Sequence, residues 1–84
     1  MNTDFSGKAA IVTGAAHGFG RAITVALARR GAHVWACDVL EDELLATREL
    51  CRDEGGICHA MTVDVRDKRA TDAFVAQALA DSAY

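Results

Sequence analysis

The most informative part of this sequence is a glycine-rich stretch at residues 13–20, which reads Thr13-Gly14-Ala15-Ala16-His17-Gly18-Phe19-Gly20. A phosphate group can approach the first turn of a helix closely only where no Cβ atom blocks it, and glycine lacks this atom. The N–H groups at a helix start also lack partners inside the helix and favour negative charge. The spacing is Gly-x-x-x-Gly-x-Gly rather than the commoner Gly-x-Gly-x-x-Gly. The stretch is therefore a candidate phosphate-binding turn.

The residues on both sides of this stretch agree with that interpretation. Residues 8–12 are a short, mostly apolar run that predicts a strand. Residues 21–30 predict a helix, because apolar side chains recur with helical spacing at Ala22, Ile23, Ala26 and Leu27. The glycines alone would fit a loop that merely turns the chain. The order of strand, glycine turn and helix favours the phosphate site.

Length, composition and charge restrict the classes of protein. A chain of 84 residues has room for one small domain. Its content of 51% hydrophobic and 25% charged residues is typical of globular proteins. The net charge of -3, with both signs mixed along the chain, offers no basic surface for nucleic acid or anionic lipid. Because the sequence shows neither a signal peptide nor a membrane-spanning run, we expect a cytoplasmic protein without nucleic-acid or membrane partners.

The chain has three cysteines without Cys-x-x-Cys spacing, Cys37, Cys51 and Cys58. This odd set predicts neither a disulfide framework nor a metal site, so we expect reduced and mostly buried thiols. His59 follows Cys58, but neighbouring strand residues point to opposite faces of a sheet, so the two do not form a reactive pair. His33 and His59 have no ligand-spaced partner, and Trp35 is best explained as a sheet residue packed against a helix.

The remaining sequence alternates further strands and helices. Gly31 is placed to stop the first helix, and residues 33–37 predict an apolar strand that ends at Asp38. Residues 41–53 predict a partly buried helix before Gly55 and Gly56, with apolar positions at Leu44, Leu45, Leu50 and Cys51. A strand at 57–63 and a helix at about 68–80 follow, with one apolar face of Ala70, Ala73, Phe74 and Ala78. This β-α-β-α-β-α order predicts an α/β fold with a parallel sheet, which is half of a Rossmann unit.

These motifs, in this order, resemble the short-chain dehydrogenase/reductase family. The resemblance runs from Phe5 to about Leu79 and includes the opening residues 5–14, the glycine turn, Asp38, and Asp64 with Val65 after the third strand. It implies an NAD-dependent oxidoreductase that transfers hydride between an alcohol and a ketone. Residues 1–84 would then be the amino-terminal part of a single, incomplete NAD-binding Rossmann domain.

The resemblance also implies a set of cofactor-binding residues. It places the three glycines of the turn at the pyrophosphate and adenosine ribose of a nicotinamide dinucleotide, and Asp64 with Val65 beside the adenine ring. Phe19 is expected to pack under the loop on the nicotinamide side more often than to stack on the cofactor. The full expected set is Gly14, His17, Gly18, Phe19, Gly20, Asp38, Asp64 and Val65.

Asp38 favours NAD over NADP. A carboxylate at the end of the second strand can accept hydrogen bonds from ribose hydroxyls and would repel a 2′-phosphate, and no arginine follows at positions 39–41. His17 argues weakly in the other direction, because NADP-preferring members of the family often carry Arg or Lys at this position. Two alternatives stay open: Asp38 could simply cap the following turn, and Asp64 could cap the last helix, although Asp67 is better placed there.

The family's catalytic residues are not expected in this stretch. Catalysis in the family uses Ser, Tyr and Lys, the last two in a Tyr-x-x-x-Lys motif, whereas the only tyrosine here is Tyr84, the final residue. The leading hypothesis is therefore the cofactor-binding part of an oxidoreductase acting on a small alcohol or ketone. The alternative is a non-catalytic nucleotide-binding or interaction module, and a flavin enzyme fits less well because of the glycine spacing. Homo-oligomer formation stays open, because the family assembles through helices beyond this stretch.

Strand order predicts an exposed edge. In the order 3-2-1-4-5-6 the first strand is central, but here it would lack its second neighbour. We expect two helices on one face of the sheet and one on the other. An apolar strand with an unpaired edge makes the isolated chain marginally stable and prone to self-association, with weak or absent NAD affinity.

Overall fold

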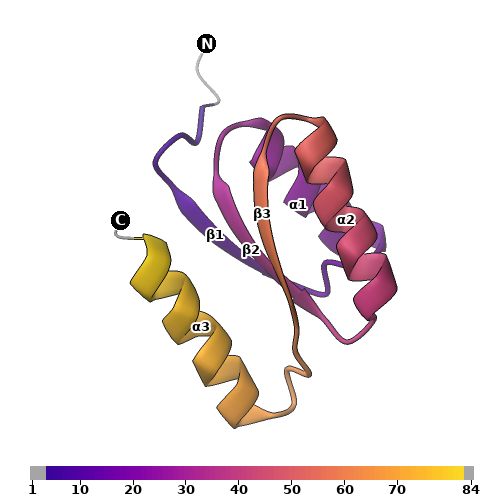
Figure 1. Cartoon of the computed structure of the whole chain (residues 1–84), viewed down its shortest axis with the longest axis vertical. Coiled ribbons are helices and arrows are strands. Elements are labelled where there is room, and N and C mark those ends of the chain that lie inside the picture. Colours follow the sequence, from indigo (N-terminus) through magenta and orange to yellow (C-terminus); the bar gives the residue numbers. More distant parts are fainter. Residues whose placement is uncertain (1–3, 83–84) are drawn as a thin grey trace.

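The computed structural model describes residues 4–82, in which three strands alternate with three helices. The elements are β1 (Ala9–Thr13), α1 (Gly18–Arg29), β2 (His33–Asp38), α2 (Glu41–Asp53), β3 (Ile57–Thr62) and α3 (Lys68–Ser82) (Figure 1). The predicted β-α-β-α-β-α order is confirmed. The boundaries differ by a few residues, because α1 begins at Gly18 rather than Arg21 and α3 continues to Ser82. Tyr84 lies outside the described residues.

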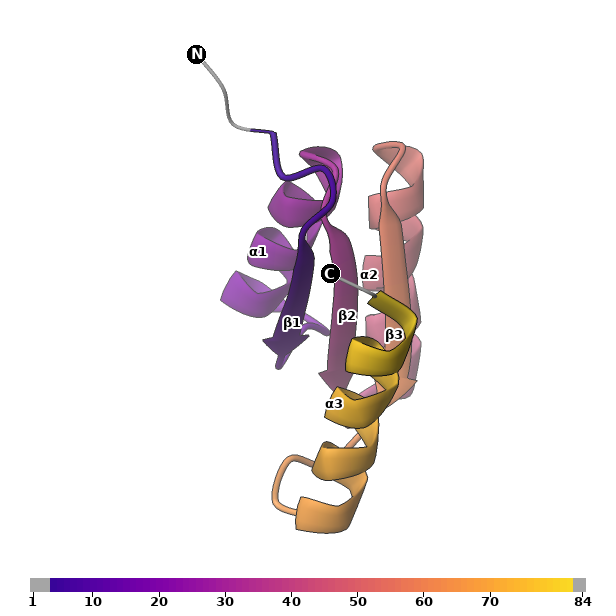
Figure 2. The ribbon, with the colours of Figure 1, turned by 90° about the vertical axis from the view of Figure 1, so that its left-hand side faces the viewer.

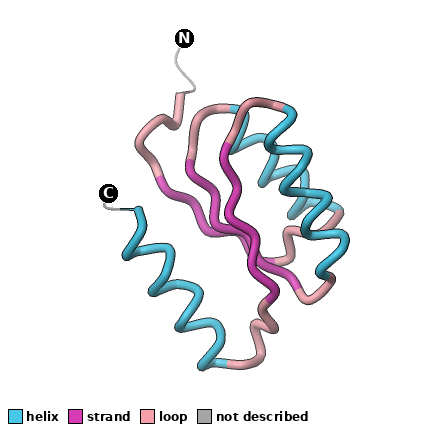
Figure 3. The backbone as a smooth tube through the Cα atoms, viewed as in Figure 1, coloured by secondary structure: helices cyan, strands magenta, loops and turns pink. Residues whose placement is uncertain are grey.

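The three strands form one parallel sheet in the order β1-β2-β3. At the middle of the register, Trp35 of β2 lies between Ile11 of β1 and His59 of β3. Because the strands run in the same direction, their carboxyl ends meet at one edge of the sheet (Figure 3). Within residues 4–82, β1 pairs on one side only, as predicted.

Helices cover both faces of the sheet, and the predicted division of two against one is confirmed. In Figure 2, α3 lies in front of the strands, while α1 and α2 lie behind them. β2 is buried on both faces, as expected for the central strand of a covered parallel sheet. Toward α1 and α2 the core consists of Ala15, Ala16, Ala28, Ala32, Val34, Ala36, Leu44 and Cys51. Toward α3 it consists of Trp35, Cys37, Val63, Phe74 and Ala78.

The apolar faces predicted for the helices are only partly buried. In α3, the buried stripe passes through Ala70, Phe74 and Ala78 and continues toward Val75, which leaves Ala73 exposed on the opposite flank. The prediction for Ala73 was therefore wrong. The apolar positions of α1 and α2 also divide. Ala28, Leu44 and Cys51 are buried, and the exposed positions are Ala22, Ile23, Ala26 and Leu50.

The ends of the helices follow the predicted signals. Gly31, with φ 97°, donates its N–H to the Ala28 carbonyl at 3.1 Å, and Ala32 donates to the Leu27 carbonyl at 3.1 Å. This pair of hydrogen bonds is a Schellman motif, which ends α1. At the start of α3, Oδ1 of Asp67 accepts a hydrogen bond from the Ala70 N–H at 3.2 Å, which confirms Asp67 rather than Asp64 as the cap.

The cysteines are free thiols, and burial differs among them. Cys37 and Cys51 are buried and Cys58 is half-buried. Burial raises the pKa of the Cys58 thiol to about 12. Cys58 packs toward α1 and α2, whereas the His59 ring stacks on Trp35 with ring centroids 4.1 Å apart, on the face that α3 covers. The predicted opposite orientation of these neighbours is confirmed. Across residues 4–82, no helix combines the length and apolar character needed to cross a bilayer.

Candidate functional site

A pocket of about 270 Å³ lies beside the carboxyl ends of the strands. It is lined by Gly14, Asp38, Val39, Val63, Asp64, Val65 and Arg66. Four residues predicted from the sequence thus line the same pocket, namely Gly14, Asp38, Asp64 and Val65. The other four predicted residues belong to the end of the glycine turn and the first turn of α1, and do not line the pocket. Ligands of open α/β sheets usually bind outside the carboxyl ends of the strands.

The backbone of the glycine turn requires glycine for two different reasons. Gly14 and Gly18 have φ angles of 68° and 61°, a region that side-chain-bearing residues rarely adopt, and a Cβ at either position would meet nothing within 4 Å. Gly20 has no space, because its Cβ would lie 1.9 Å from the carbonyl oxygen of Gly14. The turn therefore packs tightly against α1 and leaves open space at Gly14 and Gly18.

The start of α1 is available to an anion. Its N-cap residue, His17, makes no side-chain capping hydrogen bond, and the first turn contains no acidic residue. The first turn of α2 carries Glu41, Asp42 and Glu43, whose charges already oppose the partial positive charge of that helix start. The uncapped helix start and the open glycine turn together fit a phosphate group.

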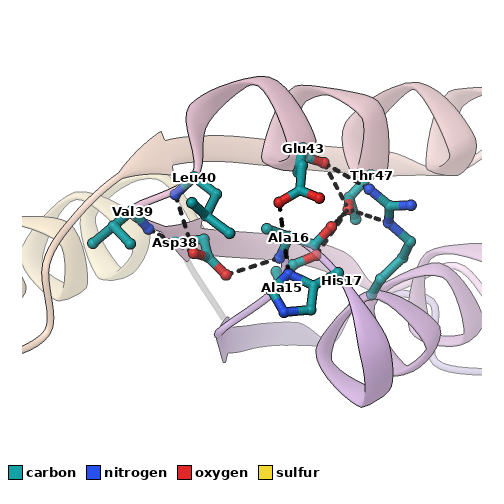
Figure 4. Close-up of polar contacts among 9 residues, drawn as sticks. Ala15, Ala16, His17, Asp38, Val39, Leu40, Glu43 and Thr47 are labelled. Carbon is teal, nitrogen blue, oxygen red and sulfur yellow. Dashed lines mark hydrogen bonds and ion pairs between the residues drawn. The ribbon is translucent and has the colours of Figure 1, made fainter.

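Asp38 joins the end of β2 to the glycine turn. Its Oδ2 atom accepts a hydrogen bond from the Ala16 N–H at 3.0 Å, and its Oδ1 atom accepts from the N–H groups of Val39 at 2.7 Å and Leu40 at 3.1 Å (Figure 4). Asp38 therefore caps the turn that follows β2. Burial tends to raise the pKa of this carboxyl, but the three N–H groups and the charge of His17 hold the pKa below its ordinary value.

Two further residues hold the turn and were not predicted from the sequence. The hydroxyl of buried Thr47 in α2 lies 2.8 Å from the Ala15 carbonyl, to which it can donate. Nε of Arg21 donates to the same hydroxyl at 2.9 Å, and Nη2 of Arg21 donates to the Glu43 carbonyl at 2.9 Å. The only signal in the sequence was a threonine on the apolar side of a helix, which does not identify its partner.

His17 and Phe19 are both exposed at the start of α1. Nδ1 of His17 lies 3.8 Å from Oε2 of Glu43, and both side chains are more than half exposed. Phe19 is 88% exposed. The packing expected for Phe19 is therefore not seen within residues 4–82. In this part of the chain its ring faces solvent.

Asp64 neither caps α3 nor stands alone in the pocket. Nε and Nη2 of Arg66 donate to its carboxylate at 3.0 and 2.7 Å, and the Arg66 N–H donates at 2.9 Å. The side-chain hydrogen bonds from Arg66 are the main reason that the pKa of Asp64 falls to about 2. Among the described residues, no cluster of His, Cys, Asp or Glu could hold a metal ion.

Comparison with known proteins identifies the family. The family model described as short chain dehydrogenase matches residues 8–83, so the chain belongs to the short-chain dehydrogenase family. An uncharacterized oxidoreductase of Mycobacterium tuberculosis is 44% identical over 80 residues, covering 81% of this chain and 29% of the relative. The 2,3-dihydro-2,3-dihydroxybenzoate dehydrogenase of Bacillus subtilis is 39% identical over 71 residues, covering 84% of this chain and 27% of the relative. The chain thus spans less than a third of these relatives.

A solved structure agrees in fold. Carveol dehydrogenase from Mycobacterium avium in complex with NAD matches with a TM-score of 0.87 and 30% identity. The match covers 94% of this chain and 33% of that protein. The Rossmann-like α/β arrangement and the family membership predicted from the sequence are confirmed.

Proposed function

We propose that residues 1–84 form the NAD-binding part of an oxidoreductase that transfers hydride between an alcohol and a ketone. The observation that carries the proposal is the pocket at the carboxyl ends of the strands, which lies beside the open glycine turn. Bound NAD would accept or supply the hydride. The residues of this chain would bind the dinucleotide and orient it.

The pyrophosphate and the adenosine part of the dinucleotide have proposed partners in this chain. The pyrophosphate would lie at the uncapped start of α1, where Gly14 and Gly18 leave room and Gly20 allows the turn to pack closely against the helix. Oδ2 of Asp38 would accept a hydrogen bond from an adenosine ribose hydroxyl, since it has one N–H partner, Ala16, whereas Oδ1 already accepts from two N–H groups. The adenine ring lies against Asp64 and Val65, which line the same pocket.

NAD is the proposed cofactor rather than NADP. The carboxylate of Asp38 would repel a 2′-phosphate, and the Arg66 guanidinium in the pocket is already paired with Asp64. The relative from Mycobacterium avium was solved with NAD, which supports the same choice. A cytoplasmic location stays a prediction from the sequence alone.

Catalysis is proposed to reside outside these residues. The sequence has one tyrosine, Tyr84, and no Tyr-x-x-x-Lys motif, so this stretch offers no general acid of the family's type. The intact mass of the natural gene product distinguishes this proposal from a non-catalytic nucleotide-binding module. A mass well above 8.9 kDa supports the oxidoreductase, whereas a mass of 8.9 kDa supports the module.

The proposed phosphate site can be tested with two matched glycine substitutions. Gly18 and Gly55 both have positive φ angles, 61° and 79°, and a Cβ at either would meet nothing within 4 Å. Gly18→Ala and Gly55→Ala should therefore impose a similar strain of about 1–2 kcal/mol. In calorimetric titrations of the natural gene product with NAD⁺, only Gly18→Ala should weaken binding, by about tenfold or more. Equal affinity in both variants would refute the proposed phosphate site.

A further inference from the structure

The His17 imidazole interacts with two carboxylates from different elements. Its Nδ1 atom is 3.8 Å from Oε2 of Glu43 at the start of α2, and its charge also acts on Asp38 at the end of β2. Figure 4 draws the His17 imidazole and the Glu43 carboxylate with this contact between them. Two carboxylates from different elements thus act on one imidazole at the start of α1.

The supporting contacts of Glu43 are made by its main-chain carbonyl and do not involve its side chain. Nη2 of Arg21 donates to the Glu43 carbonyl at 2.9 Å, and the Thr47 hydroxyl lies 3.2 Å from the same carbonyl. Thr47 also contacts the Ala15 carbonyl, so the first turns of α2 and the glycine turn are tied together. The Glu43 carboxylate has no hydrogen bond among the described residues and interacts only with His17. Replacing this carboxylate by an amide leaves the supporting contacts unchanged.

We propose that Glu43 is a residue that determines specificity for NAD over NADP, by holding and neutralising His17. Without this carboxylate, the imidazole would be free to attract the additional phosphate on the adenosine ribose of NADP. The inference rests on the proposed function of the pocket. Glu43 does not touch the proposed ribose site directly, since it does not line that pocket, and it acts through His17.

The same turn of α2 provides a matched control. Glu41 also lies in the first turn of α2 and is exposed, but within residues 4–82 it takes part in no ion pair. Glu41→Gln and Glu43→Gln remove the same charge from the same helix turn. Only Glu43→Gln removes the contact with His17.

The test is calorimetric titration of the natural gene product with NAD⁺ and with NADP⁺. We expect Glu43→Gln to tighten NADP⁺ binding about two- to fivefold, the range for an exposed ion pair, and to change NAD⁺ binding by less than about twofold. Glu41→Gln should have a smaller effect on NADP⁺. In a His17→Ala background, the effect of Glu43→Gln should fall to that of Glu41→Gln. Circular dichroism confirms that each variant is folded.

Three results would overturn the inference. An unchanged ratio of NADP⁺ to NAD⁺ affinity in Glu43→Gln, with both ligands bound, refutes the inference and leaves the proposed function standing. An equal change in Glu41→Gln, or an undiminished effect in the His17→Ala background, shows a general charge effect instead. If the wild-type protein binds neither dinucleotide, the proposed function fails and the inference fails with it.

Discussion

Two fully buried threonines, Thr24 and Thr47, have different structural functions. Thr24 donates to the Gly20 carbonyl within α1 at 2.7 Å, whereas Thr47 joins α2 to the glycine turn and accepts from Arg21. Thr47→Val would leave groups of two other segments without their partner and should lower the free energy of unfolding by about 1–3 kcal/mol. Thr24→Val should cost less, because a threonine hydroxyl that bonds back along its own helix adds little stability. Urea unfolding measures both, and equal losses would contradict this assignment.

Asp38 gives the fold a defined sensitivity to acid. Although burial opposes the effect, backbone hydrogen bonds hold the pKa of Asp38 below its ordinary value in the folded chain. Such a carboxyl stabilises the fold above its unfolded-state pKa of about 4, and this contribution is lost as the pH falls through the lower, folded pKa. We expect the midpoint of thermal unfolding to drop below pH ~4 in the wild type and to drop less in Asp38→Asn. Asp42→Asn, at an exposed carboxylate of α2, is the control and should follow the wild type.

Single residues also show where sequence reasoning stops. Asp38 was predictable, because the end of a strand after a glycine turn is a local signal, and its turn-capping alternative was local too. Thr47 and Arg21 were not predictable, because their hydrogen bonds join segments more than twenty residues apart in the sequence. The ion pair of His17 with Glu43 was missed for the same reason. Phe19 is 88% exposed in this part of the chain, which an apolar residue beside a helix start does not indicate.

At the scale of elements, the order of the strands and helices was predictable, whereas the side of each helix that faces the core was less predictable. Glycines at helix ends and hydrophobic periodicity are local, and they placed all the strands and helices of residues 4–82 within a few residues. Which apolar side chains of a helix become buried depends on the surface it meets. α1 therefore buries Thr24 and Ala28 while Ile23 stays half exposed, and α3 leaves Ala73 in solvent.

The free edge of β1 leads to a prediction for the isolated 84-residue chain. β1 pairs only with β2 in the described part of the chain, and Ile11 on this strand is 43% exposed. An apolar strand with an unpaired edge promotes association with other chains, and a lysine on such an edge opposes it. We expect the wild-type chain to self-associate and Ile11→Lys to shift the population toward monomer. Sedimentation velocity measures this shift, and a monomeric wild-type chain would show that the edge is harmless.

At the scale of the whole molecule, β1 is an edge strand in the sheet of residues 4–82. A chain of 84 residues buries little surface, and the strand that carries the glycine turn lies at the edge rather than the centre. The fold class and the family were predictable from the sequence because the ordered motifs extend over nearly the whole chain. The isolated chain is predicted to be marginally stable and to bind NAD weakly or not at all.

The most direct measurement is the pair of dissociation constants of the natural gene product for NAD⁺ and NADP⁺, determined by calorimetry under the same conditions. A carboxylate near the 2′-phosphate costs on the order of 1 kcal/mol or more, so we predict that NAD⁺ binds at least about fivefold more tightly than NADP⁺. Equal affinity, or tighter binding of NADP⁺, would contradict the assignment of Asp38 and of the pocket it lines.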